Sequence, residues 1–456
     1  MTARWTTQRI WRYPLQNAAG RPPSRSLYSL SPTRPESDNG TKCKTHNLSH
    51  LQTSWKSPVI TFRNIQHRQT TRTPVQKRSL FTSSIPTILI PPAIFIGLLV
   101  ALWTWKCFWI IMLQDKLLYL SWLPPLSRSE KIKDYKREFR GVRWSESFIR
   151  SGDGTRLAIC KGRLPSSARS VKNGDGGSGP TKKKVKVVIC YFQGNGGSTP
   201  LRLPLLSLVM NAIQESASSS SSSSMTDSEN IEHEYEYIVA ALSYRGYWKS
   251  SGRATQRGIE ADAQAFLDWV YATYASGSED LRLILWGHSL GAAVASSALA
   301  KRLSTRTATK MSGVSRGNIT GLILEAPISS IKDMLIALYP QKWLPYRYLH
   351  PFSWNNWDVA GNLEQLAQQY KTPFGNATGS TSKAGVPPIL LLSAENDEVI
   401  PLWVADQLEE KGKNLGLDIE RVNVKGAMHI EAPLKAGGRA KLVRFMRGCA
   451  EDGIKT

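Results

Sequence analysis

The sequence has few cysteines, and those it has are scattered. The 456 residues include only five, Cys43, Cys107, Cys160, Cys190 and Cys449. An odd number of widely separated cysteines predicts neither a disulfide framework nor a zinc site, because both need cysteines in a recognisable spacing. No other motif calls for a metal or an organic cofactor, so we expect the protein to work without one.

Acidic residues are scarce at the start of the chain. Residues 1–113 hold 15 Lys and Arg against two acids, Glu36 and Asp38, so about half of the net charge of +24 lies in this segment. The remainder has no arginine-aromatic motif, zinc-finger spacing or recognition-helix pattern. The basic composition therefore does not indicate a nucleic-acid partner.

The leader, residues 1–84, lacks sustained apolar periodicity and is rich in Arg, Ser, Thr and Pro. This composition is typical of a disordered segment or of a mitochondrial transit peptide. The stretch from Arg78 to Ser83 also resembles a presequence processing motif. The alternative is a basic tail oriented toward the cytoplasm. A secretory signal peptide is not expected, because the apolar region begins too late.

No charged residue occurs between Ile85 and Trp105, and after Lys106 the apolar run resumes as far as Leu113. Residues 85–113 exceed the roughly 20 residues that a membrane-spanning helix needs. They therefore predict one transmembrane helix, and their length disfavours a buried core helix. Basic residues flank the run on both sides, so no orientation is predicted.

A basic, amphipathic connection over residues 114–143 leads to a predicted α/β domain over residues 144–456. From 185 to 326, apolar strands alternate with helices, which predicts a mostly parallel sheet with helices on both faces. Three polar or low-complexity stretches are predicted to be insertions, at residues 166–184, 215–236 and 375–386.

The stretch from Leu281 to Gly291 has the layout of a nucleophile elbow. A short apolar strand ends at Gly287, Ser289 stands between two glycines, and a helix of small residues follows at once. Such a sharp strand-to-helix turn exposes a serine hydroxyl above a sheet. We therefore expect Ser289 to be the catalytic nucleophile. The alternative is a serine that serves only packing.

A glycine-rich loop, Gln193 to Ser198, directly follows the predicted strand from Val185 to Phe192. In an acyl-transfer enzyme, this loop and the residue after the nucleophile supply the N–H groups of the oxyanion hole. We expect Asn195 and Leu290 to be these two donors. A phosphate-binding loop is disfavoured, because no Gly-Lys-Ser/Thr or G-x-G-x-x-G spacing is present.

Two further residues complete a predicted triad. Asp397 follows the apolar strand that ends at Ser393, and His429 follows the next strand. In the order Ser, Asp, His, the histidine accepts the proton of the serine hydroxyl and the carboxylate orients the imidazole. The carboxylate could instead come from Glu395, while His429 is the only histidine after the acid.

Residues 327–359 interrupt the alternation of strands and helices and are rich in Trp, Tyr and Pro. Because they lie between a strand and a helix at the expected site edge, they suggest a cap over Ser289 that receives an acyl chain. A plain structural insertion is the alternative.

Several motifs together resemble one known family. They are Leu117-Leu118-Tyr119, Asp153-Gly154, Tyr191-Phe192-Gln193-Gly194-Asn195-Gly196-Gly197, Tyr244-Arg245-Gly246-Tyr247, Gly287-His288-Ser289-Leu290-Gly291, Asn396-Asp397 and His429. Over residues 114–449 the chain resembles the α/β-hydrolase family, and within it the membrane-anchored serine hydrolases that include lysophospholipases and protein depalmitoylases. Two residues depart from the family pattern, Gln193 where His is usual and Trp248 where Gly is common.

The resemblance and the motifs together predict a single-pass membrane serine hydrolase with the α/β-hydrolase fold. We expect it to cleave esters or thioesters of lipid or acylated substrates through an acyl-enzyme. The competing hypothesis is a membrane-tethered interaction protein that keeps the fold without turnover. The sequence indicates no oligomeric state.

Overall fold

The computed structural model describes residues 86–165, 183–220, 233–275, 280–308, 318–371 and 386–451. The basic leader, and with it the predicted mitochondrial address, lies outside these residues, as do most of the three predicted insertions. The chain divides into a unit over residues 1–93 and a unit over residues 94–456. All the described strands belong to the second unit.

The described strands form one sheet of eight, in the order β1-β2-β4-β3-β5-β6-β7-β8. Strand β2 is antiparallel to β1 and to β4, whereas every pair from β4 to β8 is parallel. The fold is therefore the mostly parallel α/β fold that the sequence predicted. The strands are β1 (Arg143–Arg150), β2 (Arg156–Arg163), β3 (Lys183–Phe192), β4 (His233–Leu242), β5 (Asp280–His288), β6 (Asn318–Glu325), β7 (Ile389–Ala394) and β8 (Ile419–Val424).

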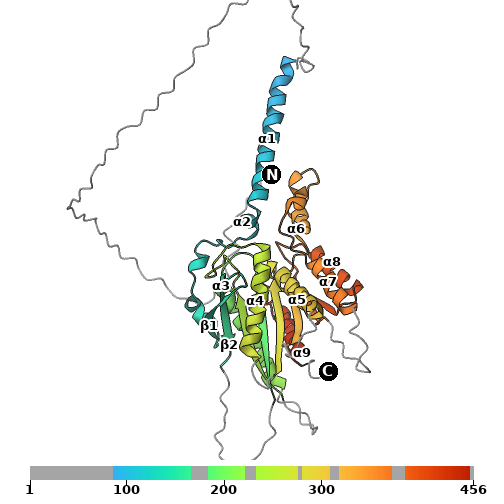
Figure 1. Cartoon of the computed structure of the whole chain (residues 1–456). Coiled ribbons are helices and arrows are strands. Elements are labelled where there is room, and N and C mark those ends of the chain that lie inside the picture. The colour runs from blue at the N-terminus through green and yellow to red at the C-terminus, as the bar shows by residue number, and fades with distance from the viewer. Residues whose placement is uncertain are drawn as a thin grey trace, which may run out of the picture. The chain divides into compact units, whose positions relative to one another are not determined.

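Helices cover both faces of the sheet (Figure 1). On one face α3 (Thr199–Ser220) and α9 (Ala436–Glu451) pack in one apolar cluster. On the other face lie α4 (Gln256–Tyr274), α5 (Leu290–Ala308), α7 (Val359–Lys371) and α8 (Leu402–Asn414). The remaining elements are α1 (Ile90–Met112), α2 (Gln114–Leu118) and α6 (Ile331–Leu338), with 3-10 turns η1 (Thr87–Leu89), η2 (Ser127–Ser129), η3 (Ile132–Glu138), η4 (Pro345–Tyr348) and η5 (His350–Phe352).

The packing of β3 explains why apolar residues in its sequence do not alternate with polar ones. Val188, Cys190 and Phe192 point into the cluster on one face. Ile189 and Tyr191 point into the cluster on the other face. Successive side chains of a strand face opposite sides, so a central strand covered by helices on both sides needs apolar residues throughout.

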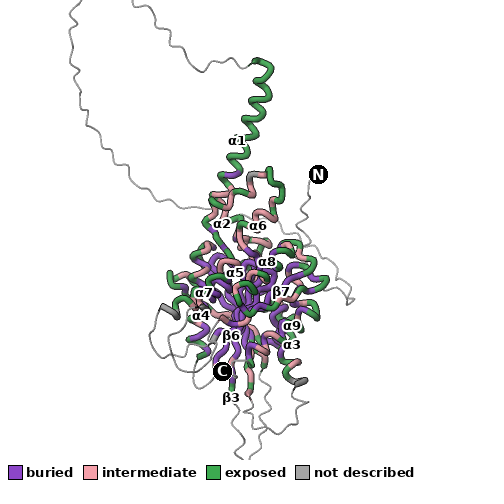
Figure 2. The backbone as a smooth tube through the Cα atoms, turned by 90° about the vertical axis from the view of Figure 1, so that its right-hand side faces the viewer, coloured by how far each residue is buried: buried purple, intermediate pink, exposed green. Residues whose placement is uncertain are grey.

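Helix α1 has the properties expected of a membrane-spanning segment. The helical stretch Thr87–Met112 has 26 residues and a mean hydropathy of 2.1, and its apolar window is not buried in the protein. Figure 2 shows that exposed residues dominate α1, in contrast to the buried sheet. By length and composition, α1 fits a single transmembrane helix.

Two predicted insertions are shorter than expected. Helix α3 continues to Ser220 instead of ending near Gln214, and β4 begins at His233 instead of Tyr237. Strand β3 likewise begins inside the stretch expected to be an insertion, because Lys183 pairs with His233 and the register continues without a break. Backbone hydrogen bonds extend the strand pairing beyond the apolar core. Because the residues there are polar, the sequence pattern did not predict these strand ends.

Two glycines allow β5 to turn sharply into α5. A methyl group built on Gly287 would overlap the carbonyl oxygen of Gly291, and one on Gly291 would overlap the carbonyl oxygen of Phe192. Both obstacles are backbone atoms of packed elements, which cannot rotate away as a side chain can. The strand and helix therefore approach each other only because these positions lack a side chain.

We expect Gly291→Ala to lower the free energy of unfolding by at least about 3 kcal/mol, because the backbone around it would have to move. Thermal unfolding of the full chain in detergent micelles measures the effect. Gly437→Ala is the control, since it adds a methyl group in open space on α9. That variant should be neutral or slightly more stable. Equal unfolding temperatures for the two variants would contradict the packing argument.

Candidate active site

Ser289 lies between β5 and α5 in a backbone conformation that residues other than glycine rarely adopt. Its φ is +53°, in the left-handed region. Its N–H donates to the carbonyl oxygen of Glu325 at 2.8 Å, and its own carbonyl oxygen accepts from Ala292 N–H at 3.0 Å. These bonds hold the strained turn at the carboxyl end of the parallel strands, where the nucleophile was predicted.

Asp397 and His429 form a side-chain pair in the structure. His429 Nδ1 lies 2.9 Å from Asp397 Oδ2 and 3.0 Å from Oδ1. Asp397 Oδ1 also accepts the N–H groups of Val399 and Ile400, at 2.9 and 2.7 Å, which fixes the carboxylate. The carboxylate thus holds Nδ1 of the imidazole, which leaves Nε2 as the nitrogen able to exchange a proton with a substrate or nucleophile.

Glu395, the alternative carboxylate, does not contact the imidazole. Its Oε2 accepts the N–H of Gly426 at 2.8 Å. The neighbouring Glu398 accepts the backbone N–H of His429 at 3.0 Å, so it holds the loop and not the ring. Of the three acids in this turn, Asp397 therefore has the geometry to orient His429.

His288 lies between the serine turn and the histidine loop. Its ring centroid is 5.1 Å from that of His429. Its Nε2 lies 3.4 Å from the carbonyl oxygen of His429. Among the described residues, no hydrogen bond joins Ser289 to His429, a contact that often tightens only when substrate binds.

The two predicted oxyanion donors lie on different elements. Leu290 is the first residue of α5, so its N–H has no acceptor within the helix. Asn195 lies in the loop after β3, where its side-chain oxygen accepts Leu120 N–H and Tyr247 OH, both at 2.9 Å. Its amide nitrogen donates to the carbonyl oxygen of Leu118. The side chain of Asn195 therefore anchors the loop, and its backbone N–H is the candidate oxyanion donor.

Gln193 fills the position where the family usually has histidine. Its side-chain oxygen accepts Thr199 Oγ1 at 2.7 Å, and its backbone carbonyl accepts Tyr244 OH at 2.8 Å. Its amide nitrogen is buried and has no partner within the described part of the chain. Gln193 in place of histidine thus keeps the start of the loop hydrogen-bonded, and its amide nitrogen is a buried donor with no partner in the described part of the chain.

The Tyr-Arg-Gly-Tyr motif has a structural role. Arg245 forms ion pairs with Asp262 of α4 at 2.6 Å and with Asp153 of the β1–β2 turn at 2.7 Å. Hydrogen bonding to Asp262 raises the pKa of the Arg245 guanidinium, so it stays charged. These ion pairs fix the loop that carries Tyr244 and Tyr247 to α4 and to the β1–β2 turn, and the two tyrosine hydroxyls donate to the loop of Asn195.

The sequence analysis missed a buried ion pair beneath the site. Glu325, the last residue of β6, is 0% exposed and pairs with Arg202 of α3 at 3.1 Å. Trp286 Nε1 donates to the second carboxylate oxygen at 2.9 Å, and Arg202 Nε donates to Tyr191 OH at 2.9 Å. A single acid at the end of an otherwise apolar strand was the available signal.

This ion pair influences the titration of the site. Burial raises the pKa of Glu325 above its ordinary value, although Arg202 and Trp286 act in the opposite direction. Burial, together with the positive charge of Arg202, holds the pKa of His288 well below its usual value. His288 is therefore neutral in the folded protein near neutral pH.

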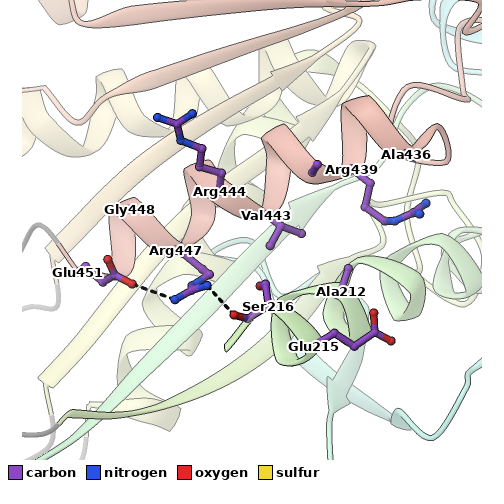
Figure 3. A pocket seen from close by; sticks show the side chains of 11 residues that line it. Ala212, Glu215, Ser216, Ala436, Arg439, Val443, Arg444, Arg447, Gly448 and Glu451 are labelled. Carbon is purple, nitrogen blue, oxygen red and sulfur yellow. Dashed lines mark hydrogen bonds and ion pairs between the residues drawn. The ribbon is translucent and has the colours of Figure 1, made fainter. Parts of the chain in front are cut away.

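The structure also contains a cavity of about 710 Å³ between α3 and α9 (Figure 3). Arg447 crosses its lining, with Nη1 donating to the carbonyl oxygen of Ser216 at 2.8 Å and Nη2 lying 3.6 Å from Glu451. None of the predicted site residues lines it. The candidate site is therefore identified from the predicted catalytic side chains and not from the size of a cavity.

We expect Arg202→Met to destabilise the protein by about 3–5 kcal/mol, because it leaves the Glu325 carboxylate buried without a cation. The lone carboxyl would keep its proton to higher pH in the folded than in the unfolded chain. The loss should therefore grow as pH rises above the ordinary value of 4.5.

Unfolding measured between pH 4.5 and 8 tests this, with Arg202→Met/Glu325→Gln as the matched control. The neutral amide can still accept from Trp286, so the double variant should recover most of the stability and lose the pH dependence. A loss that is independent of pH and not rescued would contradict the proposed energetics.

Comparison with known proteins identifies the domain. Residues 222–436 match the model of the alpha/beta hydrolase family. The chain is 26% identical over 335 residues to "Alpha/beta hydrolase domain-containing protein WAV2" of Arabidopsis thaliana, which covers 72% of this chain and 85% of the relative. It is 24% identical to "Protein bem46" of Schizosaccharomyces pombe, over 47% of this chain and 52% of that protein.

A further relative is "Lysophosphatidylserine lipase ABHD12" of Danio rerio, 28% identical over 45% of this chain and 47% of the relative. The chain thus spans about half the length of bem46 and of ABHD12. Among solved structures, an alpha-beta hydrolase from Vibrio vulnificus is similar at 14% identity, over 73% of this chain and 91% of that one, with a TM-score of 0.46. By the family match over residues 222–436 and by these sequence relatives, the chain is similar to the α/β-hydrolase family, and its strand order and strand–serine–helix turn have the corresponding α/β-hydrolase fold.

Proposed function

We propose that the protein is a membrane-anchored serine hydrolase that cleaves carboxylic esters or thioesters of lipid or acylated substrates. The observation that carries this proposal is the Asp397–His429 pair at the same sheet edge as Ser289. A buried, oriented imidazole at the same sheet edge as a serine on a strained turn is an arrangement that suits acyl transfer.

In the first half of the reaction, Ser289 Oγ attacks the acyl carbonyl carbon and passes its proton to His429 Nε2. The Asp397 carboxylate stabilises the imidazolium that forms. The negative charge that develops on the carbonyl oxygen is met by the N–H groups of Leu290 and Asn195. Collapse of this intermediate expels the alcohol or thiol, which takes the proton from His429, and leaves the acyl group on Ser289.

In the second half, water attacks the acyl-enzyme while His429 takes one of its protons. The tetrahedral intermediate collapses, the carboxylic acid leaves, and the proton returns to Ser289 Oγ. The cycle needs no metal or organic cofactor, because serine, histidine and backbone amides supply every proton transfer and charge contact.

Two features favour an acylated lipid as substrate. Helix α1 is long and apolar enough to cross a membrane, so the domain would work beside a lipid surface. One relative bears a name that states lysophosphatidylserine lipase activity. A cap over residues 327–359 would receive the acyl chain, and within it α6 and two 3-10 turns precede Asp358, which bridges to Ser330.

Labelling of the full chain by a fluorophosphonate probe should depend on Ser289. Ser289→Ala should lose the label, whereas Ser304→Ala, on the exposed end of the same helix, should keep it. Labelling of Ser289→Ala equal to that of the unaltered protein would overturn the assignment.

The acid can be tested in the same way, with turnover of a soluble ester as the readout. Asp397→Asn should lower kcat by about 10⁴-fold, because the amide stabilises the wrong imidazole tautomer. Glu395→Gln should leave kcat almost unchanged. Absence of hydrolysis across a panel of esters and thioesters would favour an interaction protein that retains the fold without turnover.

A further inference from the structure

An apolar surface lies on the cap, next to the carboxyl end of α1. Five large side chains between α6 and the segment after η5 are each more than half exposed, and Trp343 reaches 78%. We refer to them as the cap surface: Leu338, Trp343, Tyr348, Phe352 and Trp354. Soluble surfaces rarely gather so many exposed apolar side chains in one short stretch without a partner that covers them.

The contacts of this segment with α1 indicate which partner covers it. Lys106 Nζ lies 4.6 Å from the centre of the Tyr346 ring. Lys106 precedes the end of α1 at Met112 by six residues, or about 9 Å of helix at 1.5 Å per residue. The cap therefore reaches the level of the last turns of the apolar helix.

The segment after α1 is bonded to the same part of the cap. Gln114 Oε1 accepts Trp354 N–H at 3.0 Å, and Asp115 Oδ1 accepts Trp354 Nε1 at 3.2 Å. Asp115 Oδ1 also accepts the amide of Asn355 at 2.8 Å. The cap surface is therefore tied to the point where α1 would leave the bilayer.

We propose that the cap surface lies in the interfacial layer of the membrane that α1 crosses, in contact with lipid headgroups and the upper acyl chains. Trp and Tyr favour this layer, because their rings are apolar while their N–H and O–H groups remain hydrated. Exposed Lys342 and the guanidinium of Arg347 beside Tyr348 suit the phosphate groups of the same layer. The cap surface would then contact lipid and not bulk water.

The test measures position and does not depend on catalysis. The full chain carrying Trp343→Cys is labelled with an environment-sensitive fluorophore and reconstituted in phosphatidylcholine vesicles that contain a lipid with a quencher near the headgroup. The emission should shift to the blue and be mostly quenched. Lys184→Cys is near the amino end of β3, whereas the candidate site lies at the carboxyl end of the strands. This variant should show neither change.

The four described native cysteines are buried, and the unaltered protein gives the background labelling. Equal behaviour at positions 343 and 184 would overturn the proposal. A label at 343 that is shielded from iodide in water but not quenched by the lipid would mean that protein covers the surface, which also overturns it.

A separate set of contacts joins the segment after α1 to the loop of Asn195. Asn195 bonds the backbone of Leu118 and Leu120, as described above. Gly197 N–H donates to the carbonyl oxygen of Leu123 at 2.6 Å. Two residues of the oxyanion loop are therefore held by the chain that continues directly from the membrane helix.

The residue between these anchors holds the cap. Tyr119 is almost fully buried, and its OH donates to Asn355 Oδ1 at 2.7 Å and accepts Trp357 Nε1 at 2.9 Å. Residues 118–123 thus connect the oxyanion loop on one side with the cap on the other. The first connection uses the side chain of Asn195, whose backbone N–H is the proposed oxyanion donor. Tyr119, Asn355 and Trp357 have no proposed contact with the reacting atoms.

We infer that residues 118–123 position the oxyanion loop, so that Asn195 and Tyr119 act on turnover through one segment. An oxyanion donor works only if its N–H is held where the negative charge develops, and small displacements are costly. This inference rests on the proposed hydrolase function. Membrane attachment would then contribute to the catalytic geometry as well as to location.

Asn195→Ala and Tyr119→Phe should each lower kcat on a soluble ester by about 10-fold with little change in KM, since a displaced donor retains part of its effect. Because both act through one segment, the double variant should lose little more than the worse single variant. Each kcat is divided by the number of Ser289 sites that a fluorophosphonate titrates. Lys413→Ala, on the surface of α8, is the control.

A role in folding alone would reduce the titrated sites and leave kcat per site unchanged, which would overturn the inference. Fully multiplicative losses in the double variant would also overturn it, because they would show two independent effects. If the unaltered protein gives no Ser289-dependent turnover, the proposed hydrolase function fails instead.

Discussion

Backbone-to-backbone packing at Gly287 and Gly291 is the constraint on which the candidate site depends. It lets β5 and α5 meet closely enough for Ser289 to adopt a positive φ at the edge of the sheet. The carboxyl ends of the parallel strands bring the other groups to that edge. Asp397 follows β7 and His429 follows β8, so the strand order determines that their side chains meet.

A buried ion pair lies beneath this edge and connects elements that are remote in sequence. Arg202 on α3 pairs with Glu325 at the end of β6, and the carbonyl oxygen of Glu325 accepts the N–H of Ser289. The same arginine lies within 3.5 Å of the carbonyl oxygen of Ile430, next to His429. One charged network therefore supports both the serine turn and the histidine loop. Burial of His288 and the charge of the nearby Arg202 lower the pKa of His288, which keeps it neutral.

The segment after α1 is an integral part of the domain. Its backbone accepts from and donates to Asn195, while Tyr119 bonds the cap and Asp115 bonds Asn355. A simple anchor would be joined by a loose linker, since flexible linkers need no buried contacts. Here the contacts are buried or partly buried and specific, which is why we infer that α1, the proposed cap and the proposed oxyanion loop act together.

The sequence by itself determined the local features. The alternation of strands and helices was predicted from residue 185 to 326, and the central strands were recognised from their unbroken apolar runs. The order of Ser289, Asp397 and His429 indicated a triad, because each follows a strand and the carboxyl ends of parallel strands share an edge. Each of these features lies in a short stretch of sequence or depends only on the order of residues, so it can be recognised without knowledge of the fold.

Only the tertiary structure decided which groups meet. Glu395 and Asp397 are two residues apart and were both candidates, and the path of the turn directs Asp397 to His429 and Glu395 to Gly426. Arg202 and Glu325 are 123 residues apart, and no periodicity links them. The role of the Asn195 side chain depends on a segment more than 70 residues earlier. Long-range contacts depend on how the strands assemble, which local pattern does not specify.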